Sequence, residues 1–135
     1  MAAVRAELKR GRLAAEIAAA YVRARRELRR APITTVVERL RAGRSPQRVE
    51  NPYALEEARC LGRAVVRALT MVPGDTRCLR RSLVLMQLLA KRGISAQLVI
   101  GTRTSPDFLA HAWIEHDGEP VLSPGDGSFG RLVTL

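Results

Sequence analysis

The spacing of apolar residues in this chain changes at Gly93, and this change restricts the class of fold. Before Gly93 the apolar side chains recur every three or four residues, as in amphipathic helices, whereas after it they alternate, as in strands. The alternation predicts strands over Ala96–Thr102 and Ala110–His116. The turn signal Asp117-Gly118 predicts that Val121-Leu122 returns as an antiparallel partner. We therefore expect an α+β fold with helices first and a small sheet last.

Three helices are predicted ahead of the apolar segment that ends at Gly93. Strong helix formers run from Ala2 to about Arg30, with Gly11 as a point of interruption. Thr34 or Thr35 can cap a second helix that ends near Gly43. After a polar linker the helical pattern returns over Tyr53–Val72.

The linker, Gly43–Pro52, predicts how the chain is organised. It is rich in Gly, Ser, Pro and charged residues, and therefore separates a basic helical N-terminal region, 1–52, from a core of 53–135. A chain of 135 residues with 47% hydrophobic residues can bury one core, and two separate cores are not expected.

The net charge of +10 is concentrated in the N-terminal region. Residues 1–50 hold 13 basic and 5 acidic side chains, against 10 and 8 in residues 51–135. The arginines at 23, 25, 26, 29 and 30 fit either a solvated helix face or a docking surface. Nucleic-acid binding is the alternative from another class, because the charge suffices for phosphate contacts. Against it, Tyr21 is the one aromatic residue in that region, so base stacking has little to use.

The cysteine content and the hydropathy predict a cytoplasmic protein. Cys60 and Cys78 are too few for a disulfide framework, and no secretory signal or membrane-spanning segment is evident. No phosphate-binding loop and no Cys/His spacing suited to zinc occurs, so we expect no cofactor and no metal. Cys60, in the middle of the third helix, is expected only to pack.

Cys78 is the residue whose position suggests chemistry. A helix capped by Asp75 or Thr76 and ended by Lys91-Arg92-Gly93 would hold Cys78 in its first turn. Free backbone N–H groups and the helix dipole favour a thiolate there, and the N–H of Cys78 could donate to an oxyanion.

A thiolate that acts on an amide also needs a base, and two histidines are available. His111 begins a strand, from which its ring can point toward a helix end, whereas His116 lies at the turn and is expected to be exposed. A third group should orient the imidazole. Asp126 is the first choice, because the hairpin brings the segment before it alongside His111, and Asp117 is the rival.

Two further residues share the strand face of His111. Trp113 could shield the thiolate from water, fill the core, or do both, and Glu115 is expected to be a solvated charge at the end of the strand.

These motifs carry a resemblance. The segments Asp75–Leu83, Leu88–Ile94, Leu98–Gly101 and Ala110–Glu115 resemble the transglutaminase-like leader peptidases of lasso peptide biosynthesis. The similarity is greatest to the stand-alone protease half of the split form, in which leader recognition belongs to a separate chain. It covers roughly Tyr53–Leu135.

The resemblance implies a papain-like Cys-His-Asp mechanism on a transglutaminase-type core, with Cys78 as nucleophile and His111 as base. In this family an Asp commonly follows the His by about a dozen residues, a spacing that falls on Ser123 here. The segment Ser123-Pro124-Gly125-Asp126 suggests that the carboxylate has shifted to Asp126.

The implied reaction is hydrolysis of the peptide bond between the leader and the core of a ribosomally made precursor. The implied partners are the leader peptide, the recognition protein, and an ATP-dependent cyclase that joins the freed core N-terminus to an acidic side chain. A catalytically silent transglutaminase-like scaffold is the remaining alternative.

Overall fold

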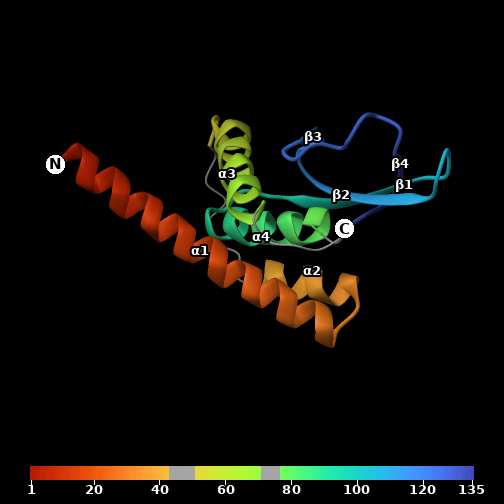
Figure 1. Cartoon of the computed structure of the whole chain (residues 1–135), viewed down its shortest axis with the longest axis horizontal. Helices are drawn as coiled ribbons and strands as arrows, with labels where there is room; N and C mark the ends of the chain where they lie inside the picture. The colour runs from red at the N-terminus through yellow and green to blue at the C-terminus, as the bar shows by residue number, and fades with distance from the viewer. Residues whose placement is uncertain (43–50, 71–76) are drawn as a thin grey trace.

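The computed structural model describes residues 1–42, 51–70 and 77–135, and it confirms the α+β fold. Figure 1 shows the helices and strands, which are α1 (Ala2–Arg30), α2 (Ile33–Arg41), α3 (Ala54–Leu69), α4 (Arg77–Lys91), β1 (Gln97–Arg103), β2 (Leu109–His116), β3 (Glu119–Pro120) and β4 (Gly130–Thr134). The predicted caps Asp75 and Thr76, linker residues 43–50 and the predicted end signal at 72–74 lie outside the described residues, and α3 ends before that signal, at Leu69.

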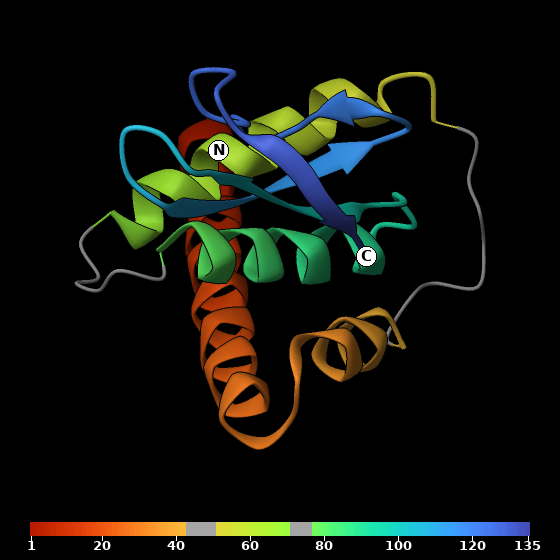
Figure 2. The same ribbon diagram turned by 90° about the vertical axis from the view of Figure 1, so that its right-hand side faces the viewer.

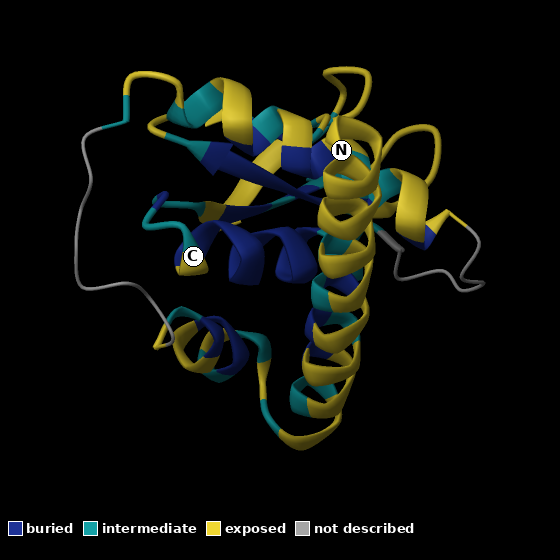
Figure 3. Cartoon of the chain, turned by 90° about the vertical axis from the view of Figure 1, so that its left-hand side faces the viewer, coloured by how far each residue is buried: buried dark blue, intermediate teal, exposed yellow. Residues whose placement is uncertain are grey.

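Helix α4 is the centre of the molecule. It lies between the sheet and α2, while α1 crosses it and α3 packs against it beside the sheet (Figures 1 and 2). Every residue from Ser82 to Ala90 is buried, so that most of the helix is coloured as buried in Figure 3. A helix that is apolar on nearly all sides must be covered on all sides, and the other elements provide that cover.

The end of α4 follows the predicted glycine signal. Gly93 has a φ of 71°, a left-handed conformation that glycine adopts without steric cost. The N–H of Gly93 donates to the carbonyl of Ala90 at 3.1 Å, and the N–H of Ile94 donates to that of Leu89 at 3.0 Å. These two bonds form a Schellman motif, which satisfies the last carbonyls of the helix and turns the chain into β1.

The four strands form one antiparallel sheet in the order β3-β2-β1-β4. β1 and β2 form a hairpin in which Gly101 pairs with His111 and Val99 pairs with Trp113. The returning strand is β3, two residues earlier than predicted, and Val121 continues it with one hydrogen bond to the carbonyl of Ile114 at 2.8 Å. The sequence analysis did not predict β4, which pairs with the other edge of β1.

The N-terminal helices share the hydrophobic core with the rest of the chain. Ile17, Ala20 and Ala24 of α1 are buried in the same cluster as residues of α3, α4 and the sheet. Gly11 does not interrupt α1, which is one continuous helix. The N-terminal part of α1, residues 1–12, is exposed and projects from the body of the molecule (Figure 1). The described helices of residues 1–52 therefore contribute to the same core as residues 53–135, and the domain boundary at residue 52 stays a prediction.

The predicted cap of α2 is wrong. Pro32 precedes the first helical residue, with φ −66° and ψ 158°, and the helix begins at Ile33. Proline already holds φ near the helical value, which lets the helix begin ahead of Thr34 and Thr35. Within the described ranges, no helix is both long enough and apolar enough to cross a membrane.

Candidate active site

Cys78 is the second residue of α4, as predicted. Its side chain is half-buried and packs against the hydrophobic core. One turn later the hydroxyl of Ser82 donates a hydrogen bond to the main-chain carbonyl of Cys78 at 2.8 Å. N–H groups in the first turn of a helix have no carbonyl partner within that helix, and the N–H of Cys78 is one of them.

His111 is the third residue of β2, and the loop between β3 and β4 contacts its ring. Its Nε2 lies 2.8 Å from the main-chain oxygen of Ser123. The ring centroids of Trp113 and Phe129 lie 5.8 Å and 5.2 Å from that of His111. The half-buried imidazole therefore lies beside two aromatic rings and contacts one carbonyl oxygen.

The two residues lie at the same end of the molecule. Figure 2 shows that β2, which carries His111 near its start, begins beside the end of α4 that carries Cys78. Along β2 the side chains alternate, and Ala112 and Ile114 belong to the core cluster against which Cys78 packs. His111 and Trp113 project from the other face, and no hydrogen bond joins Cys78 to His111 among the described residues.

Asp126 lies in the loop that covers His111, but its carboxylate has other partners. It accepts a hydrogen bond from the N–H of Ser128 at 2.9 Å and another from the Ser128 hydroxyl, and it pairs with Arg103 at 3.5 Å. The Ser128 hydroxyl and then the Ser128 N–H hold the pKa of Asp126 below its usual value. In the part of the chain that the structure describes, no hydrogen bond joins Asp126 to His111.

Asp117, the rival acid, lies at the far end of the hairpin from His111. Its carboxylate is 3.3 Å from Nε2 of His116. The expectation that His116 is exposed is wrong, because its side chain is only 13% exposed and its Nδ1 lies 2.7 Å from the carbonyl oxygen of Ser95. The chain that leaves α4 passes beside the turn and covers this ring.

Glu115 is buried at 5% exposure, which contradicts the expectation of a solvated charge. Its carboxylate accepts a hydrogen bond from Nε1 of Trp113 at 2.9 Å and pairs with Arg131 of β4 at 2.9 Å. Because β4 was not predicted, the cation that balances this carboxylate could not be foreseen. Glu115 therefore holds the indole of Trp113 and joins β2 to β4 across β1.

Cys60 also differs from its expected role. Its side chain is exposed on α3, whereas Ala58, Leu61 and Val65 form the buried face of that helix. The helical period turns Cys60 away from the core, so the expectation that it packs is wrong.

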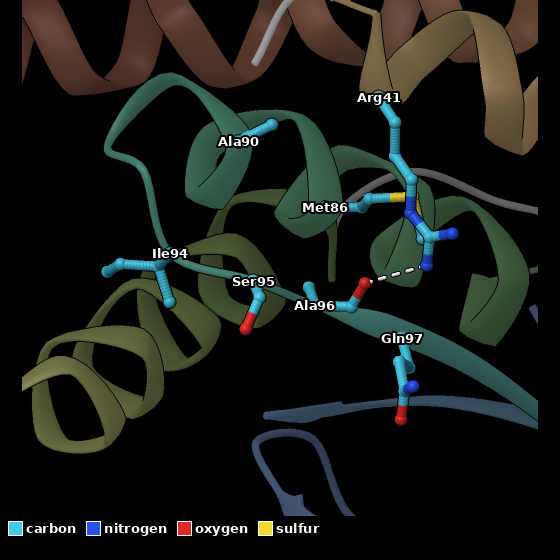
Figure 4. A pocket seen from close by; sticks show the side chains of 7 residues that line it. All are labelled: Arg41, Met86, Ala90, Ile94, Ser95, Ala96 and Gln97. Atoms are coloured by element: carbon cyan, nitrogen blue, oxygen red, sulfur yellow. Dashed lines mark hydrogen bonds between the residues drawn. The ribbon is translucent and has the colours of Figure 1, made fainter. Parts of the chain in front are cut away.

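Two of the hollows in the described surface are lined by residues other than Cys78 and His111. The first, of about 220 Å³, lies between α2, the end of α4 and the start of β1, where Arg41 donates to the carbonyl of Ala96 at 2.8 Å (Figure 4). The second, of about 540 Å³, is a groove between α1 and α3 flanked by Arg10 and Arg67. No group of three or more His, Cys, Asp or Glu side chains that could hold a metal occurs in the described ranges.

The family model of the transglutaminase-like superfamily matches residues 18–134. The chain belongs to this superfamily. The match begins inside α1 and ends in β4, so this transglutaminase-like domain includes much of the basic helical region as well as the sheet.

One protein of known role is similar to a shorter segment of the chain. This transglutaminase-like chain is 46% identical over 44 residues to the microcin J25-processing protein McjB of Escherichia coli, a match that covers 33% of this chain. The match spans about a fifth of the length of that relative, 21%. No solved structure matches the chain.

Proposed function

We propose that this chain is a cysteine peptidase that removes the leader from a lasso peptide precursor. The observation that carries the proposal is the position of Cys78 in the first turn of α4, at the end of the molecule where β2, with His111 as its third residue, begins. Membership of the transglutaminase-like superfamily and the similarity to a microcin J25-processing protein support the same reading.

The proposed reaction uses the two residues in succession. His111 takes the proton of the Cys78 thiol, and the sulfur attacks the carbonyl carbon of the scissile bond. The N–H of Cys78 donates to the oxyanion that forms. His111 then gives its proton to the leaving nitrogen, which frees the core peptide as an amine and leaves the leader as a thioester on Cys78. Water hydrolyses the thioester, which releases the leader as a carboxylic acid and restores the thiol.

The approach of Cys78 to His111 is part of this proposal, because the two side chains project from β2 and α4 without a hydrogen bond between them in the described structure. Catalytic hydrogen bonds are often long in a free enzyme and shorten when substrate binds. Because His111 projects from the face of β2 opposite to the core against which Cys78 packs, the proposed reaction requires the start of β2 to turn toward α4 when the precursor binds.

The proposed partners are the leader peptide, a separate leader-recognition protein and the cyclase that consumes the freed core. The two hollows described above are lined by residues other than Cys78 and His111. A recognition protein that holds the leader would raise the local concentration of the scissile bond at these two residues.

The test is cleavage of a lasso precursor by the purified chain together with a leader-recognition protein, measured by mass spectrometry. We expect Cys78→Ala to reduce the rate by about a thousandfold or more. Cys60→Ala is the matched control, because Cys60 is an exposed cysteine on α3, and it should cleave at the rate of the parent chain.

Two outcomes would contradict the proposal. Cleavage that persists in Cys78→Ala would exclude this thiol as the nucleophile. If the parent chain does not cleave and Cys78 reacts with iodoacetamide no faster than a free thiol, the chain is a silent scaffold. Equal rates with and without the recognition protein would contradict the proposed partner alone.

A further inference from the structure

The contact between His111 and Ser123 determines which ring nitrogen carries the proton. The main-chain oxygen of Ser123 lies 2.8 Å from Nε2, and a carbonyl oxygen can only accept a hydrogen bond. Nε2 must therefore be the N–H of the neutral ring. The other nitrogen, Nδ1, is then the acceptor and the only position at which neutral His111 can take a proton.

The turn that presents this carbonyl is held on both sides. Before it, the N–H of Val121 donates to the carbonyl of Ile114 at 2.8 Å, which ties the segment to β2. After it, the N–H of Gly125 donates to the hydroxyl of Ser123 at 3.2 Å. The position of the carbonyl is thus set by a bonded turn.

Gly125 brings this turn close to the aromatic ring that covers His111. Its φ is 89°, and a Cβ at this position would lie 2.9 Å from two ring atoms of Phe129 and 3.8 Å from the ring of His111. The ring centroid of Phe129 in turn lies 5.2 Å from that of His111. Any side chain larger than hydrogen at Gly125 would push the turn away from the imidazole.

The acid in this loop acts on the loop itself. Asp126 is bound by Ser128 and Arg103, and the Arg103 guanidinium lies 5.3 Å from the ring centroid of Phe129. Asp126 therefore stabilises the turn through Ser128 and Arg103, beside Phe129. The group that contacts the imidazole is the carbonyl of Ser123.

We propose that the main-chain carbonyl of Ser123 is the positioning group of His111, and that it holds the ring as the tautomer whose Nδ1 is the base. This inference rests on the proposed function for its catalytic meaning. The tautomer itself can be measured whether or not the chain cleaves anything.

The first experiment is nitrogen-15 NMR of the imidazole signals in the full-length chain above the pH at which the rings are protonated. His116→Gln identifies which signals belong to His111. We expect the protonated nitrogen of His111 to be Nε2 and the unprotonated one Nδ1. A spectrum in which Nδ1 carries the proton would overturn the proposal.

The second experiment moves the carbonyl. Gly125→Ala should abolish the preference for the Nε2–H tautomer and lower kcat by about a hundredfold, because a displacement of about 1 Å at a catalytic group has an effect of this size. Gly127→Ala is the matched control, since Gly127 also has a positive φ, 86°, but a Cβ there would meet nothing within 4 Å. Equal changes in the two variants would mean that the turn has no specific role.

Asp126→Asn separates this proposal from a carboxylate that orients the ring. We expect its tautomer to be that of the parent chain, because the carboxylate of Asp126 bonds to Ser128 and Arg103 and not to the ring. Loss of the Nε2–H tautomer in this variant would assign the orienting role to Asp126 and reject the carbonyl. If Cys78→Ala still cleaves while His111 has the expected tautomer, the proposed function fails and the positioning contact stands.

Discussion

Gly101 is the residue at which β1 makes room for a large ring. It pairs with His111 across the hairpin, and the indole of Trp113, from the same face of β2, lies over it. A Cβ at Gly101 would lie 2.8 Å and 2.9 Å from two atoms of that indole and 3.1 Å from the carbonyl oxygen of Gly130. The buried ring and two neighbouring backbones leave little freedom to move.

We therefore expect Gly101→Ala to lower the free energy of unfolding by about 1–3 kcal/mol, the usual range for overpacking. Gly130→Ala, in the adjacent strand, is the control, because the atom nearest to its Cβ would be 3.8 Å away. Its effect should stay within about 0.5 kcal/mol. Urea unfolding measures both, and equal stability of the two variants would show that the indole does not lie over Gly101.

At the scale of the elements, two glycines in helical segments have opposite effects on stability. Gly93 ends α4 at a φ of 71°, where a side chain is strained, whereas Gly11 lies inside α1 with nothing near the position of a Cβ. Alanine in the left-handed conformation costs about 1–2 kcal/mol, and alanine in a helix interior is about 1 kcal/mol more favourable than glycine.

Gly93→Ala should therefore lower the melting temperature, and Gly11→Ala should raise it or, if α1 frays near its N-terminus, leave it unchanged. Differential scanning calorimetry measures both changes. A lower melting temperature in Gly11→Ala would contradict the description of α1 as one continuous helix.

The elements also differ in how well their sequences predicted them. α1, α3 and α4 have long amphipathic or apolar patterns, and the bounds of α1 and α4 agree with expectation wherever the residues are described, whereas α3 ends at Leu69, before the expected Val72. β4 has five exposed residues, from Gly130 to Thr134, and its sequence has no alternation between buried and exposed positions. A strand of this kind is specified by its hydrogen bonds to a neighbour, which depend on the whole fold.

At the scale of the whole molecule, an ion pair links the N-terminal helix to the central one. Arg92, just beyond α4, makes two hydrogen bonds to the carboxylate of Glu16 on α1, at 2.9 Å and 3.1 Å. The hydrogen bond from Arg92 is the largest cause that lowers the pKa of Glu16, and the charge of Arg92 adds to it against the effect of burial.

A carboxyl whose pKa is lower in the folded than in the unfolded chain stabilises the fold above its unfolded pKa, about 4.3 for glutamate. That contribution is lost as the pH falls through the lower, folded value. We expect Glu16→Gln to reduce the free energy of unfolding by about 0.2–1 kcal/mol at pH 7, as for partly exposed pairs.

The difference between Glu16→Gln and the parent chain should disappear in strong acid, where both lack the charge. Urea unfolding at pH 7 and at about pH 3 measures this, with Glu7→Gln as a control. Glu7 is exposed on the projecting part of α1 and has no hydrogen bond or ion pair in the described structure. A loss in Glu16→Gln that did not depend on pH would contradict the assignment.

The sequence by itself determined the class of fold, the helix that carries Cys78 and the strand that carries His111, because these depend on local periodicity and on local start and stop signals. The tertiary structure decided which polar groups meet. It buried Glu115 under Arg131, covered His116, and set the carbonyl of Ser123 rather than the carboxylate of Asp126 against His111. Some of those contacts join segments that are distant in the chain. Others are made by backbone carbonyl groups, which every residue has, so the type of residue does not indicate where such a contact forms.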